Sequence, residues 1–90
     1  MNYQLVYHPE VKEDIKEFPR NIKERISTAI EKRLQVDPVY YGDPLRRSLK
    51  GFRKLRVGDY RVIYYIGGKT VFILKIGHRK DVYQDVLSRQ

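Results

Sequence analysis

Two short turn signals divide the second half of the chain into three runs of alternating residues. Gly58-Asp59 separates residues 52–57 from residues 60–66, and Gly67-Gly68 separates these from residues 70–77. Alternating side-chain character is typical of β-strands, and both dipeptides tolerate the backbone of a tight hairpin turn. The pattern therefore predicts three consecutive strands that pair as an antiparallel meander.

The first half of the chain shows one short β pattern followed by helical spacing. Residues 2–7 alternate and predict a strand. Pro9 suits the first turn of a helix over about 10–18, and Pro19 ends that helix. A second helix over about 20–35 is predicted by apolar residues at helical spacing, namely Ile22, Ile26, Ala29, Ile30 and Leu34. Two helices joined by a short turn should lie antiparallel as a helical hairpin.

Together these elements predict an α+β fold of order β-α-α-β-β-β, with a long connection over residues 37–51 before the meander. The last segment, residues 81–89, fits a strand end or a short C-terminal helix, and we favour the helix. Ninety residues support a single domain, residues 1–90, and the absence of Cys excludes disulfides and thiolate metal sites. Neither a signal peptide nor a membrane-spanning run is recognisable, so we expect a cytoplasmic protein.

The net charge of +8 is concentrated in the second half of the chain. Residues 1–44 carry seven Lys and Arg against eight Asp and Glu, a net charge of −1. Residues 45–90 carry twelve against three, a net charge of +9. Such a segregated block of cations indicates a polyanionic partner.

Alternation sorts the side chains of the three strands onto two faces. The face expected to be covered by the helices holds Leu55, Val57, Val62, Tyr64, Ile66, Phe72, Leu74 and Ile76. The opposite face holds Lys54, Arg56, Arg61, Ile63, Tyr65, Val71, Ile73, Lys75 and Arg79. Burying five unpaired cations is costly, so we expect this second face to be open to solvent or ligand. Cations interleaved with an aromatic ring suit single-stranded RNA, whose phosphates bind cations and whose bases stack on rings.

Two sequence blocks resemble the RelE family of toxin–antitoxin systems. The first block is L-K-G followed by L-R-x-G-D-Y-R-V-I-Y within residues 49–64, and the second is I-G-H-R-x-x-V-Y in residues 76–83. The resemblance also extends over the strand–helix–helix segment that precedes them. It implies a toxin that cleaves messenger RNA on the ribosome, inhibits translation and is neutralised by a RelB-like antitoxin. The implied reaction is attack of a ribose 2′-hydroxyl on the adjacent phosphate, with no metal or other cofactor.

The resemblance also implies roles for individual residues. Lys54 matches a proposed general base, Arg61 a group that stabilises charge on the phosphate, and Arg79 a proposed acid or phosphate ligand. Tyr83 matches a tyrosine that stacks on or orients the nucleotide, and His78 adds a group suited to proton transfer near neutral pH. The expected RNA-binding residues are Arg53, Arg56, Lys75 and Lys80.

The match departs from the family pattern in three respects. Some relatives carry a second lysine where this chain has Phe52, so that contact is missing or supplied by Arg53. The spacing between Arg79 and Tyr83 is also shorter than in some relatives, which puts the orientation of the tyrosine in doubt. Strict alternation places His78 on the face opposite Arg79, unless the strand bends at Gly77.

Three aromatic or imidazole side chains receive no role in the site. His8 is expected to be a strand-end residue, and Tyr40 and Tyr41 are expected to pack the long connection against the helices. These expectations rest on position alone.

Two alternatives remain open at this point. One is a ParE-like DNA gyrase poison, which shares the fold but lacks the nuclease cluster. The other is a non-enzymatic module that binds nucleic acid and antitoxin as a co-repressor. As partners we expect the antitoxin, messenger RNA and the ribosome, with no membrane. The chain should be a monomer alone and part of a hetero-oligomer with the antitoxin.

Overall fold

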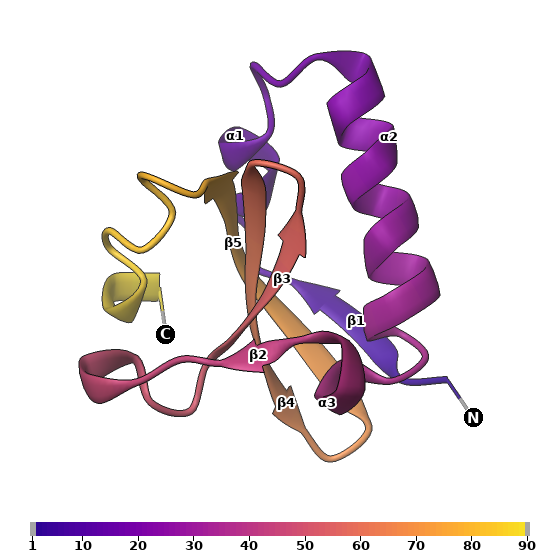
Figure 1. The fold of residues 1–90 in the computed structure, drawn as a ribbon, viewed down its shortest axis with the longest axis vertical. Coiled ribbons are helices and arrows are strands. Elements are labelled where there is room, and N and C mark those ends of the chain that lie inside the picture. Colours follow the sequence, from indigo (N-terminus) through magenta and orange to yellow (C-terminus); the bar gives the residue numbers. More distant parts are fainter. Residues whose placement is uncertain (1, 90) are drawn as a thin grey trace.

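A five-stranded mixed sheet forms the centre of the computed structural model, which describes residues 2–89 (Figure 1). The strand order is β1-β5-β4-β3-β2. The strands are β1 (Gln4–Tyr7), β2 (Asp43–Pro44), β3 (Arg53–Val57), β4 (Tyr60–Gly67) and β5 (Thr70–His78). Strands β3, β4 and β5 pair antiparallel, which confirms the predicted meander, and β1 joins the sheet parallel to β5.

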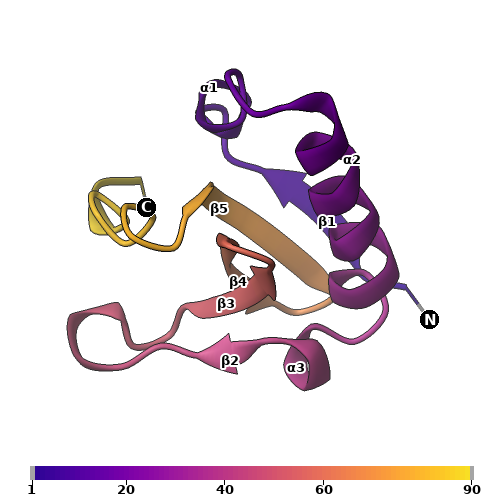
Figure 2. The same cartoon turned by 45° about the horizontal axis from the view of Figure 1, so that its top comes forward.

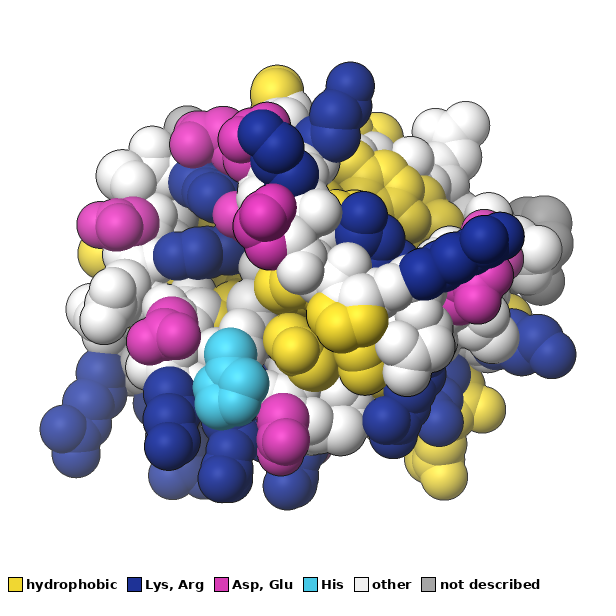
Figure 3. Space-filling model, turned by 90° about the horizontal axis from the view of Figure 1, so that it is seen from above, with side chains coloured by type: hydrophobic (Ala, Val, Ile, Leu, Met, Phe, Trp, Pro, Cys, Tyr) yellow, Lys and Arg dark blue, Asp and Glu magenta, His cyan; other side chains and the backbone are white. Residues whose placement is uncertain are grey.

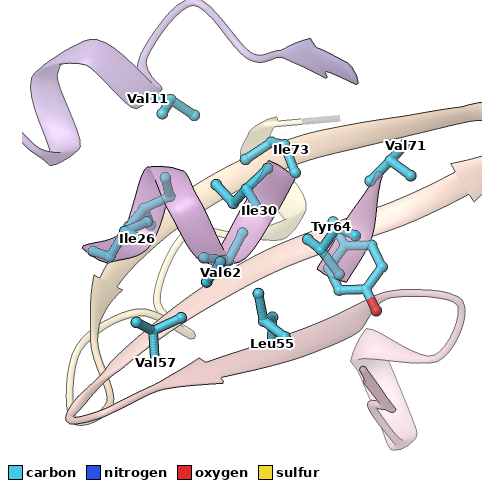
Figure 4. Packing of buried hydrophobic residues seen from close by; sticks show 12 residues of the cluster. Val11, Ile26, Ile30, Leu55, Val57, Val62, Tyr64, Val71 and Ile73 are labelled. Carbon is cyan, nitrogen blue, oxygen red and sulfur yellow. The ribbon is translucent and has the colours of Figure 1, made fainter. Parts of the chain in front are cut away.

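One long helix covers one face of this sheet. Helix α2 (Arg20–Ala29) continues into a π-helical turn, Ile30–Leu34, so that together they match the helix predicted over 20–35. The buried residues of this stretch are Ile26, Ala29, Ile30 and Leu34. They pack against Leu55, Val57, Val62 and Tyr64 of the sheet, and Figure 4 shows this cluster. Helical spacing thus predicted the face of α2 that is buried.

The first helix is shorter than predicted. Helix α1 spans Val11–Asp14 rather than residues 10–18, and the following residues form turns. Ile15 and Phe18 nevertheless pack against the core beneath α2. The tertiary contacts of these two side chains therefore outweigh the helical spacing that predicted a longer element.

A β-bulge in β5 changes which side chains of that strand face the helices. Ile63 pairs with Lys75, whereas its neighbour Tyr64 pairs with Ile73, so Leu74 is an extra residue in β5. The predicted assignment of β5 side chains to the two faces of the sheet is therefore wrong for the residues that precede the bulge. Val71 and Ile73 lie in the helix-covered core, whereas Leu74 belongs to a cluster on the opposite face. The Phe72 ring stacks on the Tyr65 ring on that same opposite face, with 4.7 Å between the ring centroids.

The second face of the sheet is only partly open, which corrects a further expectation. Phe52, Ile63 and Leu74 are buried there under Val82 and Val86 of the C-terminal segment. Figure 2 shows this segment and α2 on opposite sides of the sheet. Residues 79–85 form turns, and a single 3-10 turn (Leu87–Arg89) takes the place of the helix predicted over 81–89. The apolar side chains of this segment cover one part of the face and leave the cationic part accessible.

The long connection contains short elements of its own. Helix α3 (Pro38–Tyr41) precedes β2, and a 3-10 turn, Arg47–Leu49, follows it. The Tyr64 hydroxyl donates a hydrogen bond to the carbonyl of Pro38 at 2.6 Å, and burial raises the pKa of this hydroxyl. Tyr40 is 77% exposed and makes an edge contact with Tyr41. The expectation that Tyr40 packs against the helices is therefore wrong.

None of the helices within residues 2–89 is long and apolar enough to cross a membrane.

We predict that Gly42→Ala destabilises the fold. A Cβ atom at Gly42 would lie 1.7 Å from the Tyr64 hydroxyl oxygen and 3.0 Å from the carbonyl oxygen of Lys54. Overpacking of this kind lowers the free energy of unfolding by about 1–3 kcal/mol. Urea denaturation measures the change.

The control for this experiment is Gly68→Asn. Gly68 has φ of +58°, a Cβ atom at this position would meet no atom within 4 Å, and Asn tolerates such a backbone. Equal stability of the two variants would contradict the close approach of Gly42 to Tyr64.

Candidate active site

A hollow of about 540 Å³ lies on the second face of the sheet, beside the C-terminal segment. We call it the cationic hollow, and the side chains that line it are Lys54, Arg56, Arg61, Arg79, Lys80 and Tyr83. None of these lining residues is acidic. Figure 3 shows Lys and Arg side chains gathered along the lower edge of the molecule, with few Asp or Glu between them. The structure therefore brings together six of the residues predicted for the site.

The register of β3 and β4 forces two of these cations into opposition. Arg56 and Arg61 are direct partners across the antiparallel pair, and Lys54 lies opposite Ile63. Like charges directly opposite each other destabilise a sheet. A bound anion between them would relieve this repulsion, so the register itself favours an anionic ligand.

Arg61 is the most enclosed cation of the hollow. It is 7% exposed, which corrects the expectation that every cation of this face is open to solvent. Its Nη1 donates hydrogen bonds to the carbonyl oxygens of Gly58 at 2.9 Å and Tyr60 at 2.8 Å. Both bonds come from the same nitrogen and fix the position of the guanidinium. The other two guanidinium nitrogens take no part in these two bonds. A fixed planar guanidinium is well suited to phosphate recognition.

Arg79 and Lys80 follow the end of β5. The backbone N–H of Arg79 donates to the carbonyl oxygen of Asp59 at 2.8 Å, which anchors the residue to the β3–β4 turn. Its side chain is 56% exposed, and its Nε lies 3.9 Å from a carboxylate oxygen of Asp59. An exposed ion pair at this distance contributes little to stability. The Arg79 side chain is therefore available to a ligand.

A turn after β5 brings Tyr83 to the same hollow as Arg79. The N–H groups of Asp81 and Val82 both donate to the carbonyl oxygen of His78, which reverses the chain direction. Tyr83 is half-buried and packs against the apolar cluster that contains Val82 and Val86. The short spacing between Arg79 and Tyr83 is thus compatible with a shared site.

Three other predicted site residues lie outside the lining of the hollow, and two of them are cations with backbone partners. Arg53 donates to the carbonyl oxygens of Val39 at 2.8 Å and Gly42 at 2.9 Å, and so holds the long connection. The Lys75 ammonium donates to the carbonyl oxygen of Gln84. These two cations have structural roles, and the structure does not bring them into the hollow.

The third of these residues, His78, is separated from the hollow in the way that strict alternation predicted. Its ring lies 5.8 Å from that of Tyr60, which packs against the helix-covered core. Its Nδ1 accepts a hydrogen bond from the N–H of Lys80 at 3.2 Å. The Nδ1 of His8 makes the same kind of local hydrogen bond, accepting from the N–H of Glu10 at 3.1 Å.

The chain matches known toxins over most of its length. Residues 5–83 match the family described as ParE toxin of type II toxin-antitoxin system, parDE. Toxin RelG of Mycobacterium tuberculosis is 33% identical over 86 residues, which cover 93% of this chain and 99% of that protein. The chain belongs to the RelE/ParE toxin superfamily.

Solved structures of superfamily members share the fold of this RelE/ParE toxin. The crystal structure of the toxin–antitoxin complex RelBE2 from Mycobacterium tuberculosis contains a chain with a TM-score of 0.82 and 31% identity. That match covers 88% of this chain and all of the other. A mutant of the Escherichia coli toxin RelE in the free state has a TM-score of 0.72 at 19% identity, over 99% of this chain and 94% of the other. The second similarity is one of fold alone.

An ion pair whose side chains are 11% and 9% exposed holds the C-terminal segment of this RelE/ParE toxin in place. The guanidinium of Arg89 donates to both carboxylate oxygens of Asp14, at 2.6 and 2.7 Å, and to the carbonyl oxygen of Leu74 at 3.1 Å. Asp14 also accepts from the N–H of Ile76, next to the bulge. Hydrogen bonding to Asp14 raises the pKa of the Arg89 guanidinium. This pair positions the segment that carries Tyr83.

Sequence patterns did not identify this pair. Asp14 and Arg89 are 75 residues apart. Asp14 lies in a segment that was predicted to be a helix, and Arg89 in one that fitted a strand end or a short helix. Neither residue carries a motif.

We predict that Arg89→Ala lowers the free energy of unfolding by about 3 kcal/mol, because it leaves the Asp14 carboxylate buried without its cation. The variant should also be cut faster by trypsin after Lys80, which is exposed in the segment that Arg89 holds. Urea denaturation and limited proteolysis measure the two effects.

A double-mutant cycle with Asp14→Ala tests the coupling, since two residues in direct contact should give non-additive effects. The control is Arg20→Ala, which removes an ion pair to Glu24 whose side chains are 91% and 69% exposed. Additive effects of Asp14→Ala and Arg89→Ala would show that the pair does not act as a unit.

Proposed function

We propose that this toxin is a metal-independent endoribonuclease that cleaves messenger RNA on the ribosome and so inhibits translation. The observation that carries the proposal is the convergence of five cations and one tyrosine in a hollow lined by no acidic residue among those described. Such a cluster is repulsive until an anion occupies it, and the RNA backbone supplies closely spaced anions. The similarity to the proteins named Toxin RelG and Toxin RelE supports a role as a toxin.

The proposed reaction forms one bond and breaks one bond at phosphorus. Lys54, acting as a neutral amine, accepts the proton of a ribose 2′-hydroxyl, and the 2′-oxygen attacks the adjacent phosphate. The bond from phosphorus to the 5′-oxygen breaks, which leaves a 2′,3′-cyclic phosphate and a 5′-hydroxyl. Arg61 stabilises the added charge on the phosphate, and Arg79 binds that phosphate or protonates the departing 5′-oxygen. Every atom of this step comes from the RNA and from groups of the hollow.

Tyr83 and the remaining cations would bind the nucleotide rather than react with it. Tyr83 borders the hollow from the C-terminal segment, where its ring can stack on a base. Arg56 and Lys80 lie where they can neutralise neighbouring phosphates. In this proposal residues 1–90 act as a single toxin domain in the cytoplasm, and His78, Arg53 and Lys75 support the fold.

We predict that Arg79→Ala abolishes cleavage while the fold is retained. Loss of a positioned charge or proton donor lowers the rate of such a reaction by about 10²- to 10⁴-fold. The side chain is more than half exposed, so its removal should change thermal stability little. Lys54→Ala should behave in the same way. Cleavage is measured on ribosome-bound messenger RNA by primer extension.

The matched control is Lys69→Ala, which removes an exposed cation at the β4–β5 hairpin, outside the cationic hollow. Circular dichroism and thermal melting establish that each variant is folded. Wild-type cutting by folded Arg79→Ala and Lys54→Ala variants would remove the nuclease mechanism.

A gyrase poison is the second candidate, because the matching family is described as a ParE toxin. Both readouts can be taken on one sample of wild-type toxin in an extract that contains ribosomes, gyrase and supercoiled DNA. Cleaved messenger RNA supports the nuclease, and trapped gyrase–DNA complexes support the poison. If neither product forms, the result favours a non-enzymatic co-repressor.

We predict that an acidic RelB-like antitoxin binds this toxin through an amphipathic helix or strand and forms a hetero-oligomer with it. The similar structure from Mycobacterium tuberculosis is that of a toxin–antitoxin complex, and the net charge of +8 favours an acidic partner. Affinity should fall as salt rises.

Co-expression with the neighbouring open reading frame, followed by pull-down at low and high salt, measures this interaction. Arg79→Ala should retain antitoxin binding. Failure to recover a partner, together with a wild-type chain that is harmless to growth, would contradict the toxin–antitoxin assignment of function.

A further inference from the structure

A second basic groove lies between α2 and the β3–β4 turn. We call it the α2 groove. It has a volume of about 490 Å³, and the cations that line it are Arg25, Lys32, Arg33 and Arg56. Glu24 is the one acidic residue among the described residues of its lining. The groove is thus strongly cationic, although it plays no part in the reaction proposed above.

The cations of the α2 groove are not neutralised by the protein. Within residues 2–89, no carboxylate oxygen lies within 4.0 Å of the charged nitrogens of Arg25, Lys32 or Arg33. Glu24 is instead within 3.8 Å of Arg20. All three cations are exposed, so they can contact a ligand without rearrangement of the core. Their charge is available to an anionic partner.

The α2 groove and the cationic hollow meet at the β3–β4 turn. Arg56 lines both of them. The Arg25 guanidinium lies beside Gly58, 3.0 Å from where a Cβ atom of that residue would be, and Arg61 donates to the Gly58 carbonyl oxygen. The cations therefore form a continuous track from the hollow, past Arg56, into the groove.

We propose that the α2 groove binds the backbone phosphates of the RNA strand that leaves the cationic hollow. The inference rests on the proposed nuclease function and extends its substrate beyond the nucleotides next to the cut. None of the described residues that line the groove is aromatic, so bases have no ring on which to stack. Contacts to phosphates carry no sequence information, and the groove therefore adds affinity without adding base preference.

The test uses fully 2′-O-methylated RNA strands, which lack the attacking hydroxyl, of two lengths. A strand of about 3 nucleotides should occupy the hollow alone, whereas one of about 12 nucleotides should reach the groove. The groove variant is Arg25→Gln/Lys32→Gln/Arg33→Gln. The control variant, Lys12→Gln/Lys16→Gln/Lys69→Gln, removes the same charge from exposed residues that line neither the hollow nor the groove.

Fluorescence anisotropy at several salt concentrations measures the Kd of each protein variant for each RNA strand. The groove variant should bind the longer strand about 10-fold more weakly. In a plot of log affinity against log salt concentration its slope should be shallower by about 2, because each of the three lost phosphate contacts contributes ~0.7 to that slope. Its Kd for the shorter strand should be that of the wild type. The control should change either Kd by less than about twofold, as expected where screened charges are remote.

Two results overturn the inference while the proposed function stands. One is equal loss of long-strand affinity in the groove and control variants, and the other is a wild type that binds both lengths equally. Failure of the wild type to bind either strand counts with the second of these results, whereas failure to cut ribosome-bound messenger RNA would overturn the proposed function itself. Thermal melting of both triple variants establishes that they are folded.

Discussion

The bulge in β5 is the constraint on which both faces of the sheet depend. One extra residue at Leu74 lets Val71 and Ile73 fill the core under α2, while Leu74 and Lys75 turn to the other face. Without the bulge, strict alternation would place Val71 and Ile73 on the face of the sheet opposite α2. The bulge also lies where Asp14 accepts a hydrogen bond from the N–H of Ile76. Two apolar clusters and the anchor of the C-terminal segment thus depend on one irregularity.

Local patterns predicted the parts of the fold that depend on neighbouring residues. The hairpins at Gly58 and Gly67, the faces of β3 and β4 and the buried stripe of α2 all follow from spacing along the chain. The bulge did not, because it arises where two strands meet and leaves no mark in the alternation of β5. The cover over Ile63 was missed for a similar reason, since the residues that bury it come from the far C-terminal segment.

The candidate site divides in the same way. Lys54, Arg61, Arg79 and Tyr83 were found because they belong to short motifs, and the fold gathers them at one hollow. Arg53 and Lys75 were chosen for their charge, yet carbonyl groups of remote segments accept their hydrogen bonds. A cation can bind a ligand or tie down a loop, and only its neighbours in the folded chain decide which. Arg61 ties down the β3–β4 turn and also lines the hollow, where it lies opposite Arg56.

The ion pair between Asp14 and Arg89 has a consequence for how the protein is made. It joins the first helix to a residue 75 positions later, and β1 must also wait for β5 before it can pair. During synthesis the ribosome delivers the chain from its N-terminus at a limited speed. The segment that carries Tyr83 cannot be anchored until Arg89 has emerged from the exit tunnel. The cationic hollow, which Tyr83 lines, is therefore completed only after the chain has been made as far as Arg89.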